Sequence, residues 1–357
     1  MNIVNETPFT VAIMLWEDLQ GQPKLTVIVK ATFAIKTSKP TLADKQFPIF
    51  TADEHYRDDP LASVRFESDM VPFKPLADVV LAGRAHAPSG RPVTKLDVAI
   101  RVGRLQRAIR ILGDRKWWYP SKLTLIPVVS SPEPFITMDL TYERAFGGID
   151  EASAMYCKEN PIGKGFIGKK SKDSAHGKPL PNLEDPHNLI SFWDSRPKPV
   201  GFGFYGRGWM PRLHYAGTYD EKYQKERAPA LPHDFSYAIF NGAHPALQVK
   251  GYLNGDEVIE LKNLSREPAM RFQLPGLHPK IIINKLTVPP DEWIEQNTME
   301  GNEVSLEQIP TAEESVKAVL DTLVLVPDKG IFYEVFRGVC PLADLNALEI
   351  DQIKITT

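Results

Sequence analysis

Residue types that could do chemistry occur along this chain of 357 residues, but their spacing matches no common metal site. The densest acidic cluster with a histidine is Asp53-Glu54-His55-Tyr56-Arg57-Asp58-Asp59. An EF-hand loop that began at Asp53 would need a glycine at its sixth position and a glutamate at its twelfth, where the chain has Asp58 and Val64. We therefore interpret the cluster as a solvated acidic loop and expect no metal.

The histidines and cysteines give no stronger signal for a metal or for nucleophilic catalysis. Five of the eight histidines fall between positions 176 and 244: His176, His187, His214, His233 and His244. None form an H-E-x-x-H pair, and no G-x-S-x-G elbow is present. Cys157 and Cys340 lie too far apart for a zinc-ligand pair or a disulfide framework. We expect two reduced thiols and a protein that is not an enzyme.

One carboxylate and its neighbour leave an alternative open. Glu143 and Arg144 lie in Tyr142-Glu143-Arg144-Ala145-Phe146-Gly147-Gly148, and a carboxylate can act as a general acid or base. A hydrolase of unknown substrate that uses Glu143, or an acid from Glu184-Asp185, is therefore the alternative function. The structural interpretation is an ion pair that anchors the entry to a Gly/Pro-rich region.

Two glycine-rich phrases resemble nucleotide-binding loops without meeting their requirements. Gly201-Phe202-Gly203-Phe204-Tyr205-Gly206 matches G-x-G-x-x-G, but it follows a proline-rich stretch and leads into Gly208 and Pro211, which do not suit the required helix. Asn160–Phe166 contains Gly163-Lys164-Gly165 but lacks the spacing and the Ser or Thr of a phosphate loop. We expect glycine-aromatic loops and no cofactor.

The elements that would position these residues are mainly β. Thirty-one prolines leave little room for long helices. The segment 9–35 predicts a hairpin whose second strand alternates strictly, as a half-buried strand does. Further strands are predicted at 78–85, 96–102, 105–112, 246–253, 258–261, 269–274, 280–286, 322–326 and 331–337. Tight turns between them favour antiparallel sheets in a sandwich-like or barrel-like arrangement.

Helix signals are few, and a Gly/Pro-rich central region separates two β-rich ends. Thr218-Tyr219-Asp220-Glu221 predicts a short helix that ends before Ala228-Pro229, and Thr311-Ala312-Glu313-Glu314 predicts another near 312–321. We predict an N-terminal β-rich part (1–141), an irregular Gly/Pro/aromatic-rich central region packed on the β core (142–235), and a C-terminal β-rich part (236–357).

The central region is basic although the whole chain has a net charge of −3. Residues 158–212 hold ten Lys or Arg against five Asp or Glu, together with several aromatic side chains. Lysines near aromatics could hold a single nucleic-acid strand, but the acidic chain and the lack of a known motif argue against it. A surface for another protein fits this composition, because aromatics and arginines dominate interface energies. The candidate anchors are Phe146, Trp193, Tyr205, Trp209 and Arg212, with a buried structural role as the alternative for each.

Nothing in the sequence predicts a membrane span or an export signal. The longest uninterrupted apolar run, Val11 to Trp16, is far shorter than a bilayer requires, and the N-terminus lacks a basic region followed by an apolar stretch. We expect a cytoplasmic protein.

Seven short phrases, taken in order, resemble the signature of one bacterial family. They are Tyr142–Gly148, Asn160–Phe166, Leu180–Glu184, Trp209-x-Pro211-Arg212, Gly217–Glu221, Leu231-Pro232-x-Asp234-Phe235, and Leu247-Gln248 through Glu257. The chain resembles the type VI secretion effector adaptors or chaperones, and the similarity is densest from about Asp78 to Gln273.

This resemblance implies an adaptor that binds one toxic effector and helps to load it on the spike (valine-glycine repeat) protein of the contractile tail. The implied partners are therefore a secreted effector and the spike. The resemblance implies no cofactor and no catalytic residue, so the expected function is protein binding without chemistry.

Overall fold

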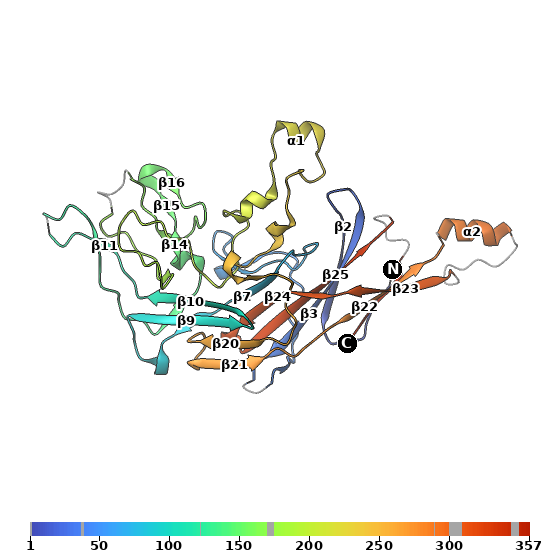
Figure 1. Ribbon diagram of the computed structural model, residues 1–357, viewed down its shortest axis with the longest axis horizontal. Helices are drawn as coiled ribbons and strands as arrows, with labels where there is room; N and C mark the ends of the chain where they lie inside the picture. Colours follow the sequence, from blue (N-terminus) through green and yellow to red (C-terminus); the bar gives the residue numbers. More distant parts are fainter. Residues whose placement is uncertain are drawn as a thin grey trace.

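The computed structural model describes residues 2–36, 39–121, 123–169, 175–288, 290–299, 309–343 and 350–357 (Figure 1). Within these ranges the chain is mainly β, with several sheets that are largely antiparallel and two α-helices, as the sequence predicts. Lys170 and Lys172, two of the ten basic residues between positions 158 and 212, lie outside the described residues.

The largest sheet has seven strands and takes them from both ends of the chain. Its strands are β2 (Thr10–Glu17), β3 (Pro23–Ala34), β4 (Thr41–Leu42), β7 (Ala77–Leu81), β19 (Gln248–Val249), β24 (Val319–Val326) and β25 (Ile331–Pro341). They run in the order β19-β7-β24-β25-β3-β2, with β4 paired to β3 beyond the end of β2. The N-terminal and C-terminal β-rich parts therefore share one sheet and one main core.

Two smaller sheets pack against one face of this large sheet. The five-stranded sheet contains β9 (Lys95–Val102), β10 (Leu105–Leu112), β18 (Leu183–Glu184), β20 (Val258–Lys262) and β21 (Ala269–Gln273). The four-stranded sheet contains β1 (Asn2–Asn5), β22 (Lys280–Leu286), β23 (Thr311–Lys317) and β26 (Ile350–Thr356). Phe272 stacks on Phe332 of β25 at 5.4 Å between ring centroids. Gly338, farther along β25, leaves room for Ile281 and Val316, which a Cβ there would meet at 2.8 and 2.9 Å.

Short two-stranded ladders lie outside these three larger sheets. They pair β5 (Glu54–His55) with β6 (Val64–Phe66), β8 (Arg84–His86) with β13 (Thr137–Asp139), β11 (Trp117–Trp118) with β12 (Val128–Val129), β14 (Phe146–Gly147) with β17 (Lys164–Gly165), and β15 (Ile149–Asp150) with β16 (Met155–Tyr156). In Figure 1, β11 and β14 to β16 lie together at one end of the molecule.

The first hairpin forms as predicted, but its second strand is not half-buried. β2 and β3 pair in continuous antiparallel register from Thr10↔Lys30 to Glu17↔Pro23. Both faces of β3 are covered, and even Lys30 on its polar face is fully buried. The Lys30 Nζ lies 2.8 Å from an Asp69 carboxylate oxygen. Burial lowers the pKa of Lys30 to about 8, although Asp69 favours the charged form.

Three buried ion pairs lie along this polar face of the large sheet. Lys30 pairs with Asp69, Lys74 pairs with Asp78 at 2.7 Å, and Arg337 pairs with Asp321. Lys30, Asp78, Arg337 and Asp321 lie on four different strands, whereas Asp69 and Lys74 come from the segment before β7. The alternating polar residues of the strands therefore face charged partners and not water.

The helix predicted near 312–321 is wrong. Residues Thr311–Lys317 form β23, which pairs with β22 over seven consecutive residues, and β24 begins at Val319. The Thr-x-x-Glu spacing is a local signal worth about 1 kcal/mol, and the pairing of two strands over a buried core outweighs it.

The two observed helices lie on the surface. α1 (Glu221–Glu226) follows Asp220, whose side chain accepts a hydrogen bond from Tyr223 N, so the short helix predicted here is confirmed. α2 (Pro290–Met299) was not predicted from the sequence. In Figure 1 each helix projects away from the sheets.

A buried carboxyl group makes the stability of this fold depend on pH. Glu334 of β25 lies on the face that carries Phe332 and Phe336, and it is fully buried. Neither carboxyl oxygen has a hydrogen-bond partner within the described part of the chain. Burial raises the pKa of Glu334 well above its usual range, so the folded protein keeps this group protonated where the unfolded chain ionises it.

We predict that Glu334→Gln flattens the pH dependence of stability above about pH 5. The folded wild type binds one proton more than its unfolded chain there, so its free energy of unfolding falls by about 1.4 kcal/mol per pH unit until the folded pKa is reached. Urea unfolding of both proteins from about pH 5 to pH 7 measures the difference. Parallel curves would contradict the prediction.

Candidate partner-binding surface

Three of the five predicted anchors come together in one internal cluster. The rings of Tyr205, Trp209 and Tyr142 contact one another edge to face, with centroids 5.3 to 5.4 Å apart. Arg212 is buried beside them, donating from Nη2 to Glu67 Oε1 at 2.6 Å and from Nε to Ile239 O at 2.7 Å. Its guanidinium also donates to Tyr205 O. The contacts of Tyr205 and Arg212 are therefore internal.

The glycines of the G-x-G-x-x-G match make room for these rings. A Cβ on Gly201 would lie 2.7 Å from the Tyr142 ring, and a Cβ on Gly206 would lie 2.6 Å from the Trp209 ring. The residues after Gly206 form turns and a 3-10 segment, Arg212–Ala216, and not the helix that a dinucleotide site needs. The phrase is a glycine-aromatic loop.

The other two predicted anchors, Phe146 and Trp193, belong to a second, smaller cluster. Its buried members are Trp117, Phe146, Cys157, Ile167, Ala175, Leu180 and Ile190. Trp193 is half-buried and packs against them. Burial raises the pKa of the Cys157 thiol to about 11, which keeps it protonated and unreactive at neutral pH.

The short phrases that carry the family resemblance pack against one another. The buried Asn160 side chain donates to Tyr142 O at 2.8 Å and Phe146 O at 3.0 Å, which joins the first phrase to the second. Thr218 N donates to Asp234 Oδ1 at 2.9 Å and thus closes the base of the arm that carries α1. The first two phrases are thus joined by buried contacts, whereas the phrases at 217–221 and 231–235 meet at the surface.

The scaffold presents an exposed apolar hairpin, residues 117–121 and 123–129, and Lys122 between them lies outside the described residues. Its base is held by Trp117, whose N donates to Lys178 O at 3.0 Å and whose side chain is buried in the second cluster. The turn is closed by Thr124 N, which donates to Ser121 O at 3.1 Å. Beyond the base, large apolar side chains face solvent: Trp118, Leu123, Leu125, Ile126 and Val128, with Leu123 at 91% and Leu125 at 81% exposed.

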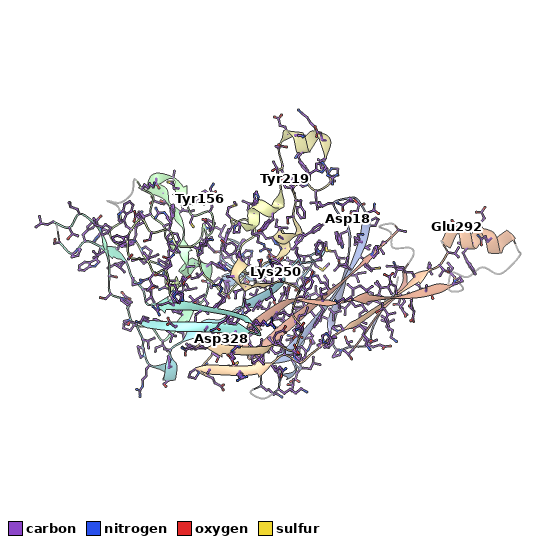
Figure 2. All side chains as sticks on the ribbon, in the orientation of Figure 1. Asp18, Tyr156, Tyr219, Lys250, Glu292 and Asp328 are labelled. Carbon is purple, nitrogen blue, oxygen red and sulfur yellow. The ribbon has the colours of Figure 1, made fainter. Side chains whose placement is uncertain are left out.

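Further exposed apolar residues gather at this end of the molecule. Among the described residues, eleven of the nineteen exposed large apolar side chains lie between positions 118 and 192. Tyr156, labelled in Figure 2, belongs to the neighbouring β15–β16 ladder, with Ile149 and Met155. Exposed apolar side chains that are concentrated in one part of a chain indicate a candidate interaction surface.

No prediction from the sequence included this hairpin. The signal was present, because the stretch Leu123-Thr124-Leu125-Ile126 lies between Pro120 and Pro127 and is more apolar than a solvated loop requires. Exposure cannot be read from such a stretch, since the same residues would suit a buried strand.

Glu143 lines a charged cleft of about 650 Å³ between the large sheet and the central region. It accepts hydrogen bonds from Ser63 N at 2.8 Å and from Ser63 Oγ at 2.6 Å. Burial works to raise the pKa of Glu143, but the hydrogen bonds from Ser63 outweigh it, and the pKa lies below its usual value. Glu143 is thus ionised and holds the loop that contains Ser63. A general acid would instead need a raised pKa.

A second cleft, of about 500 Å³, opens at one end of the polar face of the large sheet. Its walls are aromatic, with Trp16, Phe73, Tyr237 and Tyr252 among them, and Asp321 and Arg337 line its floor. This arrangement can accommodate an apolar group beside an ion pair.

Comparison with known families gives one match. The family model described as "Uncharacterized protein conserved in bacteria (DUF2169)" matches residues 20–337, nearly the whole chain. The chain belongs to this bacterial family. No curated protein and no solved structure matches it. In this member of the family, the described residues include no cluster of His, Cys, Asp and Glu able to hold a metal ion, and no described helix is long and apolar enough to span a membrane.

We predict that Arg212 is a structural residue and that its neighbour Arg207 is not. Both contact Glu67 Oε1, but the Arg212 side chain is 4% exposed and that of Arg207 is 39% exposed. Arg212→Met should lower the free energy of unfolding by about 3–5 kcal/mol, because it leaves Glu67 short of its buried partner. Arg207→Met should cost about 1 kcal/mol or less. Equal losses in urea unfolding would contradict this assignment.

Proposed function

We propose that the protein is a non-enzymatic adaptor that binds another polypeptide. The observation that carries the proposal is the apolar hairpin, which exposes five large apolar side chains on a base fixed by a buried cluster. A rigid base reduces the ordering entropy that binding costs, and exposed aromatic and aliphatic residues supply the contact energy. Such a surface suits recognition better than catalysis.

The partner is, in this proposal, a secreted effector of the type VI system, which the adaptor helps to load on the spike protein of the contractile tail. Support comes from the resemblance of the seven phrases to effector adaptors or chaperones. An adaptor of this kind would act in the cytoplasm, before secretion, and would need no cofactor.

The basic composition of the segment on which the hairpin packs indicates the chemistry of the polypeptide that would bind there. The hairpin packs on the central region through Ile167, Leu180 and Ile190, and residues 158–212 carry ten Lys or Arg against five Asp or Glu. A segment with apolar side chains flanked by Asp or Glu would complement both features, because opposite charges guide encounter and orientation.

The alternatives receive less support. For a hydrolase that uses Glu143, the lowered pKa of that carboxyl argues against a general acid, and Glu184 is buried against Arg115. For a nucleic-acid binder, four of the five exposed apolar side chains of the hairpin are aliphatic, whereas single strands are held by stacked aromatics and cations. Oligonucleotide binding with a steep dependence on salt would favour that class.

We predict that Leu123→Asp combined with Leu125→Asp prevents capture of the effector. The test is co-purification of the full chain with the product of a neighbouring gene, and the expected loss is at least about tenfold, since central apolar contacts dominate interfaces. Both side chains are exposed, so thermal unfolding should be unchanged.

Leu61→Asp is the matched control. Leu61 is 81% exposed, as Leu125 is, but it lies in the loop between β5 and β6 and outside the hairpin. It should leave capture unchanged. Capture that survives the double substitution in a folded protein would refute the hairpin as the binding surface.

A further inference from the structure

The large sheet ends at a strand whose outer edge is unpaired. β2 is the last strand of the order β19-β7-β24-β25-β3-β2, and no described strand pairs with its other side. It is eight residues long, and its register with β3 has no bulge. Asp18, labelled in Figure 2, marks the turn at its end.

Backbone hydrogen bonds identify which residues of β2 point outward. Thr32 O accepts from Ala43 N on the side where β2 and β4 lie, and Pro23 O accepts from Leu342 N on the β25 side. Successive residues of β3 point their backbone N–H and C=O groups toward opposite neighbouring strands. The backbone groups of Lys30 therefore point toward β2, and the hydrogen bond that Lys30 O accepts from Thr10 Oγ1 agrees with this direction. The residues of β2 whose backbone N–H and C=O groups point inward, toward β3, are therefore Thr10, Ala12, Met14 and Trp16.

The outward residues are Val11, Ile13 and Leu15. Their N–H and C=O groups have no hydrogen-bond partner among the described residues. Natural proteins protect such edges with proline, lysine or a bulge, because a free edge recruits another strand. β2 has none of these, and its residues Val11 to Trp16 are apolar without interruption.

We propose that this edge is an interface between two copies of the chain, paired antiparallel through β2. With Ile13 on the dyad, Ile13 lies opposite Ile13 and Val11 lies opposite Leu15 of the second copy. Every outward N–H and C=O of these three residues then forms a hydrogen bond, with two bonds for each opposed pair. The two large sheets become one continuous sheet.

A second copy fits this edge because β2 is complementary to itself. An occupant must be apolar on both of its faces, since Val11, Ile13 and Leu15 lie on one face of β2 and Ala12 and Met14 on the other. β2 meets this condition. In the proposed register Glu17 lies opposite Phe9, so no like charges face each other. This proposal does not depend on the adaptor function or on the apolar hairpin.

Cysteine cross-linking tests the register. In the full chain, Ile13→Cys places two thiols across the dyad at about 5.5 Å between Cα atoms, within the range of a disulfide. Leu15→Cys is the control: Leu15 is 38% exposed, but two copies of this residue would lie about 14 Å apart. The native Cys157 and Cys340 are buried. Under mild oxidation we expect Ile13→Cys to form dimers at least about tenfold faster than Leu15→Cys.

Proline substitution tests the edge itself by light scattering. The wild type should have the mass of a dimer, and Ile13→Pro should have the mass of a folded monomer, because it removes an outward N–H and no bond to β3. Ile13 also packs against the core, so the unfolding temperature should fall, but less than for a proline that breaks a bond to β3. Ala12→Pro, one residue away, removes an N–H used within the sheet and should lower the unfolding temperature. The proposal would be overturned by any of three results: a monomeric wild type, a dimeric Ile13→Pro, or equal cross-linking of the two cysteine variants. If the wild type is a monomer, the edge of β2 is open to a different protein.

Discussion

The fold depends on a short acidic and basic segment, Glu67–Asp78, that crosses the polar face of the large sheet. Its first two carboxylates bind partners from distant parts of the chain: Glu67 binds Arg212 and Asp69 binds Lys30. Its lysine, Lys74, pairs with Asp78 four residues later, in β7. Arg337 donates to the backbone oxygen of Asp69 as well. Each of these charges is buried, so each one must keep its partner, and the segment fixes the central region on the sheet.

This constraint holds one of the family-like phrases in the interior, and buried contacts between the phrases hold others. The Trp209-x-Pro211-Arg212 phrase meets Glu67, and the Tyr142–Gly148 phrase receives Asn160 from the next one. The residues that make the chain recognisable therefore hold the irregular central region in shape without long helices or strands. The surfaces that we propose for binding lie elsewhere, on the hairpin 117–129 with its exposed apolar side chains and on the outer edge of β2, which no described strand pairs with.

The two proposed interfaces use different physical chemistry. The hairpin offers side chains, so its specificity would come from the shape and the flanking charges of the partner. The β2 edge offers backbone groups, so its register would be set by hydrogen bonds and by the alternation of apolar residues. Figure 1 places β11 of the hairpin at one end of the molecule and β2 away from it, which leaves room for both to be occupied at once.

The sequence by itself determined the β class, the β2–β3, β9–β10 and β24–β25 hairpins and the helix after Asp220, because local periodicity and turn chemistry decide these elements. Only the tertiary structure decided the rest. Residues 311–317 form β23 because they pair with β22, and the polar face of β3 is buried because the segment Glu67–Asp78 covers it. Packing buries Tyr205 and Arg212 but leaves Leu123 exposed. Residue type does not reveal burial, because burial depends on contacts between residues far apart in the chain.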